Sequence, residues 1–152
     1  MKRFSCLLIS FVFIMSAAVL ASSGQDSSAA GIKFEHGNWA DITARAKKEN
    51  KIIFLDAFAS WCGPCKWMAK NVFTDAKVGD LFNEKFVCAK IDMEKGEGND
   101  LRKKFGVMAF PTFLYISPDG ETIIHRTCGS TPAETFIQNG LNALDPEKQL
   151  FT

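Results

Sequence analysis

The sequence of 152 residues has little of several features that would indicate other classes of protein. It contains two histidines, and its Cys-x-x-Cys pair at residues 62–65 has no second copy elsewhere in the chain. The other possible zinc ligands are scattered without ligand spacing: His36, Cys88, His125 and Cys128. No metal site and no cofactor are therefore expected. The chain also lacks internal repeats, so a repeat architecture is not expected.

The first 21 residues are predicted to be a secretory signal peptide. Basic residues precede an apolar run over residues 4–21, which ends in small residues with Val19-x-Ala21 as the expected cleavage site. An uncleaved membrane anchor is the alternative, because a run of this length is close to the shortest that spans a bilayer. In either case the domain is expected outside the cytoplasm, in the periplasm or an equivalent compartment, with membrane contact only through an uncleaved signal segment.

Charge gives no reason to expect nucleic acid or acidic lipid as a partner. The chain has 18 basic and 17 acidic residues, and removing residues 1–21 takes away two basic residues and no acidic one, which leaves 16 and 17. A net charge near zero provides no electrostatic attraction to a polyanion.

The remainder is predicted to form one domain. Residues 22–31 are rich in Ser, Ala and Gly and indicate a flexible tether, residues 32–145 form the domain, and residues 146–152 form a loose tail. Cleavage of residues 1–21 from 152 leaves 131 residues, enough for one hydrophobic core. We expect a monomer.

Hydrophobic periodicity and turn residues predict alternating strands and helices. Strands are predicted over residues 32–34, 52–58, 86–92, 112–116 and 122–127, and helices over 38–49, 62–73, from a Thr74 cap through Phe82, over 100–105, and from a capping box at Thr131 with Pro132 first in the helix. This order predicts an α/β fold, with a central mixed β-sheet flanked by helices on both faces.

The cysteine pair at residues 62–65 carries the clearest chemistry. Pro64 suits the first turn of a helix, so Cys62 is placed at a helix N-terminus. Free N–H groups and the helix dipole favour a thiolate there. Cys65 lies one turn further on, where it can displace whatever Cys62 attacks. The pair therefore predicts a dithiol/disulfide exchange centre. A purely structural disulfide is the alternative, although a loop this short restrains the unfolded chain little.

With Trp61 and Lys66, the motif reads WCGPCK and resembles the signature of the thioredoxin family. The resemblance covers roughly residues 33–144 and implies the thioredoxin fold. It also implies that Asp56, six residues before Cys62, is a buried acid that relays protons to the second cysteine. The Phe110-Pro111-Thr112 stretch resembles the family's cis-proline loop, which lies against the cysteines.

Residues 72–82 are more similar to extracytoplasmic thioredoxin-like domains, such as the C-terminal domain of the thiol:disulfide interchange protein DsbD, than to compact thioredoxin. This likeness implies protein disulfides as substrates and a membrane electron donor as a partner. Clients are expected to dock against Trp61, Gly63, Pro64, Phe110 and Pro111.

The predicted activity is reduction of protein disulfides, with Cys62 as nucleophile and Cys65 as resolving thiol. Two alternatives stay open at this point. The compartment equally suits an oxidase or isomerase of secreted proteins. A binding module with redox-silent cysteines is the other.

Two further cysteines, Cys88 and Cys128, are predicted on strands too far apart for a disulfide. We expect both to be reduced and buried. Thioredoxins often keep a lysine near the buried acid, and the alignment places Cys88 at that lysine's position.

Overall fold

The computed structural model describes residues 31–149. The predicted signal peptide, nearly all of the tether and the last three residues lie outside this range, so the proposed division of the chain at residues 21 and 31 stays a prediction. Within residues 31–149, no helix is both long enough and apolar enough to cross a membrane.

A four-stranded sheet forms the centre of the domain, with the strand order β2-β1-β3-β4. The strands are β1 (Ile52–Phe58), β2 (Phe86–Asp92), β3 (Thr112–Ile116) and β4 (Ile123–Cys128). Strand β1 is parallel to β2 and antiparallel to β3, and β3 is antiparallel to β4. The sheet is therefore mixed, as predicted, and the buried run of β1 lies in its interior.

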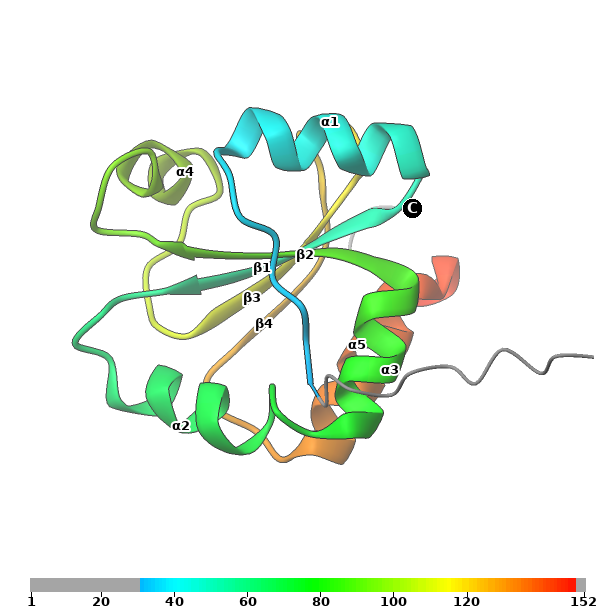
Figure 1. Ribbon diagram of the computed structural model, residues 1–152. Coiled ribbons are helices and arrows are strands. Elements are labelled where there is room, and N and C mark those ends of the chain that lie inside the picture. The colour runs from blue at the N-terminus through cyan, green and yellow to red at the C-terminus, as the bar shows by residue number, and fades with distance from the viewer. Residues whose placement is uncertain (1–30, 150–152) are drawn as a thin grey trace, which may run out of the picture.

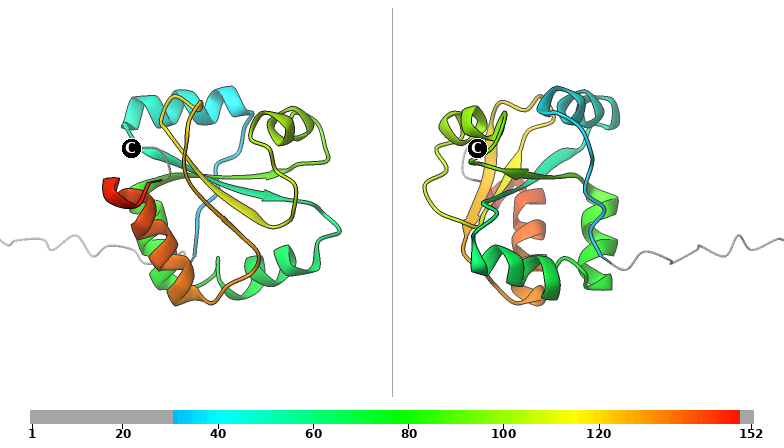
Figure 2. Two further views of the ribbon diagram at one scale, coloured as in Figure 1. Left: turned by 180° about the vertical axis from the view of Figure 1, so that it is seen from behind. Right: turned by 60° about the vertical axis from the view of Figure 1, so that its left-hand side comes forward.

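Helices cover both faces of the sheet (Figures 1 and 2). Helices α1 (Trp39–Glu49) and α4 (Gly98–Lys104) lie on one face. On the other face lie α2 (Gly63–Asn71), α3 (Ala76–Lys85) and α5 (Ala133–Leu144). This layered arrangement confirms the predicted α/β thioredoxin fold.

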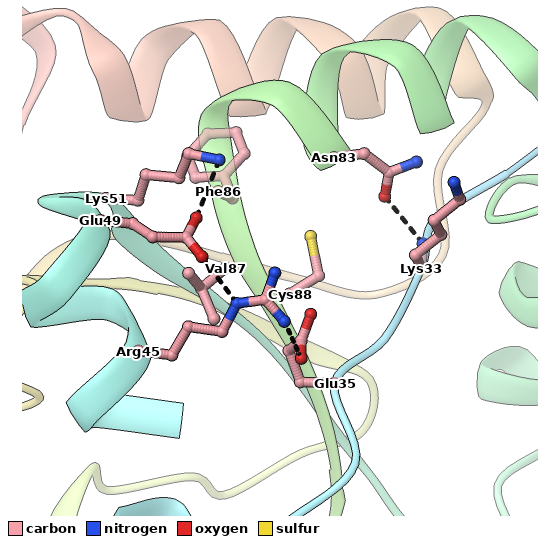
Figure 3. Close-up of a pocket in the computed structure, with 9 residues that line it drawn as sticks. All are labelled: Lys33, Glu35, Arg45, Glu49, Lys51, Asn83, Phe86, Val87 and Cys88. Carbon is pink, nitrogen blue, oxygen red and sulfur yellow. Dashed lines mark hydrogen bonds and ion pairs between the residues drawn. The ribbon is translucent and has the colours of Figure 1, made fainter. Parts of the chain in front are cut away.

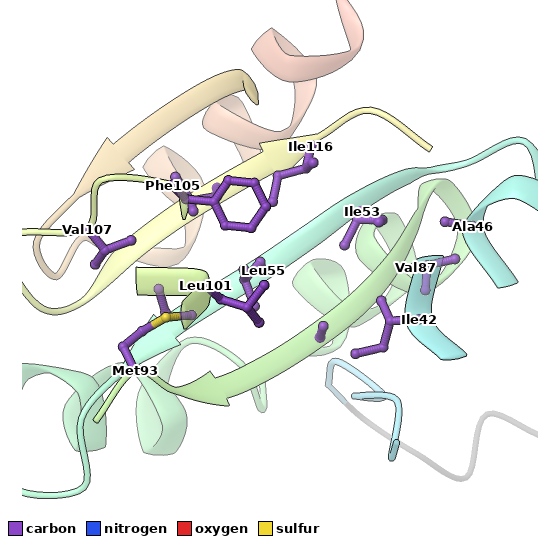
Figure 4. Close-up of a cluster of buried hydrophobic side chains, with 13 residues drawn as sticks. Ile42, Ala46, Ile53, Leu55, Val87, Met93, Leu101, Phe105, Val107 and Ile116 are labelled. Atoms are coloured by element: carbon purple, nitrogen blue, oxygen red, sulfur yellow. The ribbon is translucent and has the colours of Figure 1, made fainter. Parts of the chain in front are cut away.

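Alternation along β1 divides its side chains between two cores. Ile53 and Leu55 face α1 and α4, where they join Ile42 of α1 and Leu101 of α4 in one buried cluster (Figure 4). Both β1 side chains are completely buried, which explains why this strand shows no polar alternation in the sequence.

The opposite core is rich in phenylalanine. The Phe54 ring lies 4.9 Å from that of Phe82 in α3 and 5.6 Å from that of Phe136 in α5, between ring centroids. Phe82 and Phe136 stack on each other at 4.7 Å. Because aromatic pairs add about 0.5–1.5 kcal/mol beyond their burial, these contacts hold α3 and α5 against the sheet.

The predicted strand at residues 32–34 is wrong. The segment is extended, but its backbone bonds go to different partners: Ile32 N–H to Phe73 O (2.7 Å) and Glu35 N–H to Cys88 O (2.8 Å). Lys33 N–H donates instead to the Asn83 side chain (2.8 Å). A ladder needs successive bonds to one strand, so this segment crosses the edge of β2 without joining the sheet.

Two predicted helix starts are also corrected. Helix α3 is capped by Asp75 rather than Thr74, because Asp75 Oδ1 accepts the N–H groups of Lys77 (2.8 Å) and Val78 (3.2 Å). Helix α5 has Pro132 at its N-cap and no side-chain cap, so the predicted capping box does not form. The tail is more ordered than predicted, since residues 146–148 form a 3₁₀ turn.

Cys88 lies beneath a small polar pocket of about 100 Å³ that the 32–37 segment, α1 and β2 enclose (Figure 3). An ion pair between Arg45 and Glu35 closes one side of it. Burial raises the pKa of the Cys88 thiol far above its ordinary value. Cys88 is therefore buried and unpaired, as predicted.

Cys128 is also unpaired but lies exposed at the end of edge strand β4. The prediction that it is buried is wrong, because the outer strand of the sheet is only partly covered and its last residue is open to solvent.

Close packing of α3 against the N-terminal segment gives a stability prediction. A Cβ on Gly79 would lie 2.5 Å from Gly31 O, so Gly79→Ala is expected to lower the free energy of unfolding by about 1–3 kcal/mol. Gly63→Ala is the control for helix propensity, because a Cβ there would meet nothing within 4 Å. Urea unfolding measures both variants. An unchanged free energy of unfolding in Gly79→Ala would show that residue 31 is not held against α3.

Candidate active site

The cysteine pair lies where β1 leads into α2 (Figure 1). Cys62 is the N-cap residue of α2, and Pro64 lies in the first turn, as predicted. The N–H of Cys65 donates to Cys62 Sγ (3.1 Å). The two sulfurs form a disulfide, with the Cα atoms 5.3 Å apart. On reduction, the same N–H group is placed to stabilise a thiolate on Cys62.

The surroundings of the disulfide differ sharply in exposure. Cys62 and Cys65 are 2% and 3% exposed, whereas the Trp61 side chain before them is 68% exposed. Phe110 packs against the cysteines and meets the Trp61 ring edge-to-face, with centroids 6.0 Å apart. The nearly buried sulfurs therefore lie beside an exposed aromatic surface.

The residues predicted to contact clients differ in exposure around the disulfide. Gly63 and Pro64 are exposed at the start of α2, while Pro111 is buried after Phe110. The Phe110–Pro111 peptide bond is cis, as the family resemblance implies.

Asp56 lies inside the sheet and is completely buried. Its Oδ2 forms an ion pair with Lys90 Nζ, and its Oδ1 has no hydrogen-bond partner among the described residues. Loss of hydration disfavours the carboxylate, while the ammonium group favours it. Burial is the larger effect and raises the pKa of Asp56 above its ordinary value. Asp56 can thus hold a proton that an exposed aspartate would release.

Lys90, and not Cys88, takes the lysine position beside the acid. In the β1–β2 register, Asp56 lies opposite Lys90, and Cys88 lies opposite Phe54. Cys88 and Lys90 are two residues apart and share one face of β2. The prediction that Cys88 takes the lysine's position is therefore wrong by two residues. The register cannot be fixed from β2 alone, but a lysine directly after four apolar residues of β2 is a signal for this role.

Aromatic rings enclose the Lys90 ammonium group. Nζ lies 4.4 Å from the ring centroid of Phe58, 5.2 Å from that of Phe73 and 5.7 Å from that of Phe34. Cation–π attraction stabilises a charge in this setting, so Lys90 is held in place beside Asp56.

A pocket of about 200 Å³ lies between Lys90, the ion-pair partner of Asp56, and the second cysteine. Cys65 and Lys66 line it from α2, and Phe58 and Lys90 line it from the sheet. A water molecule occupies about 30 Å³ in the liquid, so the pocket has room for water between Lys90 and Cys65. The pocket therefore brings the Lys90 side chain and Cys65 to one space.

Among residues 31–149, no group of three or more His, Cys, Asp or Glu side chains is placed to hold a metal ion. The described part of the site consists of a disulfide, a buried acid with its lysine, and an aromatic rim. Such an arrangement is suited to exchanging disulfides.

Comparisons with known proteins agree with this geometry. The family model described as thioredoxin-like matches residues 35–118. The DsbD thiol:disulfide interchange protein of Yersinia pestis is 34% identical over 96 residues, which are 62% of this chain and 16% of that protein. The chain therefore spans only a small part of the length of the DsbD proteins it matches.

Solved structures of thiol-disulfide proteins also resemble this chain. A candidate disulphide isomerase from Bacteroides thetaiotaomicron is 44% identical, with a TM-score of 0.68 over 77% of this chain and 96% of that one. The oxidised C-terminal domain of Neisseria meningitidis DsbD is 26% identical, with a TM-score of 0.55 over 65% of this chain and 86% of that one. The likeness to the C-terminal domain of DsbD predicted from the sequence is confirmed.

Proposed function

Because the chain belongs to the thioredoxin-like family, we propose that it is a monomeric thiol-disulfide oxidoreductase that reduces protein disulfides outside the cytoplasm. One observation carries the proposal: Cys62 caps α2, and the N–H of Cys65 is aimed at its sulfur. This geometry favours a Cys62 thiolate at neutral pH, which is the form that attacks disulfides.

The reaction proceeds through a mixed disulfide. The Cys62 thiolate attacks one client sulfur, and the other client sulfur leaves as a thiolate that takes up a proton. Cys65 then loses its proton through the pocket toward Asp56 and attacks Cys62 Sγ. The Cys62–Cys65 disulfide forms, the client leaves with both sulfurs reduced, and two electrons have passed from protein to client.

The dithiol must then be regenerated by a donor of two electrons. The similarity to DsbD supports a membrane electron carrier in this role. The apolar run over residues 4–21 supports export, which would place the domain in the periplasm or an equivalent compartment.

The direction of electron flow is tested by the redox equilibrium of Cys62 and Cys65. Protein equilibrated in a series of glutathione buffers is treated with a thiol-trapping reagent, and the reduced fraction is measured. We expect a reducing potential near that of thioredoxin, about −270 mV.

The 44% identical candidate disulphide isomerase favours a second function, that of an isomerase or oxidase. A potential of about −180 mV or higher, in the range of isomerases and oxidases, would support this second function and contradict the reductase. A protein whose cysteines cannot be reduced and reoxidised would contradict both.

A further inference from the structure

Four side chains around the active site form a closed network. The Trp61 indole N–H donates to Glu94 Oε2 (2.7 Å), and Glu94 Oε1 pairs with Arg102 Nη1 (3.2 Å). The Arg102 guanidinium carbon lies 5.2 Å from the Phe110 ring centroid. Phe110 in turn contacts Trp61 edge-to-face, so each of the four side chains contacts two others. We call these residues the Trp61–Phe110 network.

We propose that Arg102 is a positioning residue for protein clients, which acts by holding Trp61 and Phe110 in place. The inference rests on the proposed function and extends it to a residue of α4 outside the cysteine motif. Arg102 acts on both aromatic residues: it pairs with Glu94, which accepts the Trp61 N–H, and its guanidinium lies over the Phe110 ring.

The position of Arg102 is itself fixed. Its Nε donates to Val107 O (3.2 Å), which lies in the stretch between α4 and Phe110. Arginine suits this place because its planar guanidinium can stack on a ring and donate sideways at the same time. Arg102 thus connects α4, the loop after β2 and the segment before Pro111.

The loop after β2 also holds the residue before Trp61. Ser60 Oγ donates to Asp92 Oδ2 (2.9 Å), and Lys95 Nζ donates to Ser60 Oγ (2.9 Å). Consecutive residues, Ser60 and Trp61, are therefore both bound by residues 92–95. A side chain as exposed as Trp61 needs such restraints to keep one orientation.

Holding the two rings should matter for binding and not for sulfur chemistry. A preformed surface lowers the entropy lost when a folded client docks. Arg102 contacts Glu94, Val107 and Phe110, and not the sulfurs themselves, so removing its charge while keeping an apolar contact with Phe110 should leave the redox potential unchanged. A small aromatic disulfide needs no extended docking surface and should react equally well without Arg102.

The test compares Arg102→Met with wild type in the reduction of insulin and of the small disulfide 5,5′-dithiobis(2-nitrobenzoate). Methionine keeps apolar contact with Phe110 and removes the charge and the donors. We expect KM for insulin to rise about fivefold to tenfold, with kcat, the redox potential and the small-disulfide rate unchanged. Arg102→Lys should recover part of the loss, and Lys103→Met, an exposed neighbour in α4, is the matched control.

Two results would overturn the proposal. One is a KM of Arg102→Met for insulin within twofold of the values for wild type and Lys103→Met. The other is an equal loss of activity toward the small disulfide. If wild type itself fails to reduce insulin, the proposed function fails, and Trp61 motion then decides the role of Arg102. Time-resolved fluorescence anisotropy, with Trp39 and Trp67 replaced by Phe, should show a more mobile Trp61 in Arg102→Met. Equal mobility would contradict the positioning role.

Discussion

Replacing Cys62 with serine is expected to abolish insulin reduction, with a fall in rate on the order of a thousandfold or more. A serine hydroxyl is not ionised at neutral pH, so the N–H that Cys65 directs at this position would have no thiolate to stabilise. The rate is measured from the turbidity of the released insulin B chain, with dithiothreitol as the electron source.

Cys65→Ser should give a different defect. This variant keeps the attacking sulfur but cannot resolve the intermediate, so we expect a mixed disulfide between Cys62 and the client to accumulate. Non-reducing electrophoresis and mass spectrometry detect the adduct. Cys128→Ser is the control, because it removes an exposed thiol outside the motif and should leave the rate unchanged.

The assignment of roles would be wrong if Cys62→Ser retained reductase activity or if Cys65→Ser formed no adduct. A redox-silent binding module predicts a third result, in which client binding is the same in wild type and both variants. Slow labelling of reduced Cys62 by iodoacetamide at neutral pH would also favour that module.

The parts of the site that depend on local sequence could be predicted well. A Pro-containing turn between an apolar strand and a helix places Cys62 at an N-terminus whatever the rest of the chain does. The burial of Asp56 was predicted from the family resemblance and from its place six residues before Cys62, and β1 does bury this residue completely. In both cases a few covalent bonds determine the relative position, so no long-range contact has to be known.

The parts that depend on pairing between distant segments could not. The prediction placed Cys88 where Lys90 lies, because the β1–β2 register decides which β2 side chain meets Asp56 and one face of β2 offered more than one candidate. The segment at residues 32–34 has strand-like composition, yet the nearby Asn83 side chain takes up its backbone N–H. The Arg102–Phe110 contact joins α4 to a later loop, and no sequence spacing indicates it.

Asp56→Asn is expected to make the protein more stable and a slower enzyme. The fold raises the pKa of Asp56 through burial, so the native state holds a proton that the unfolded chain releases. Wild type therefore loses stability as pH rises above about 3.8, the ordinary value, until it passes the raised pKa. Asparagine resembles the protonated acid and avoids this loss, which amounts to about 1.4 kcal/mol for each unit of pKa shift.

Urea unfolding of the oxidised proteins between pH 4 and pH 9 measures the difference, and oxidation prevents titration of Cys62 and Cys65. The gain in Asp56→Asn should grow with pH and then level off. Lys90→Met is the matched control. It removes the charge that favours the carboxylate, so the pKa of Asp56 should rise further and the loss of stability should extend to higher pH.

Asp56→Asn should also slow release of the client. Without a carboxylate to accept its proton, Cys65 attacks the mixed disulfide more slowly, by on the order of a hundredfold near neutral pH. The effect should shrink at alkaline pH, where hydroxide can take the proton instead. If Asp56→Asn is less stable than wild type at pH 8, the Asp56–Lys90 pair stabilises the fold on balance. Release at the wild-type rate would show that the proton leaves Cys65 by a path that avoids Asp56.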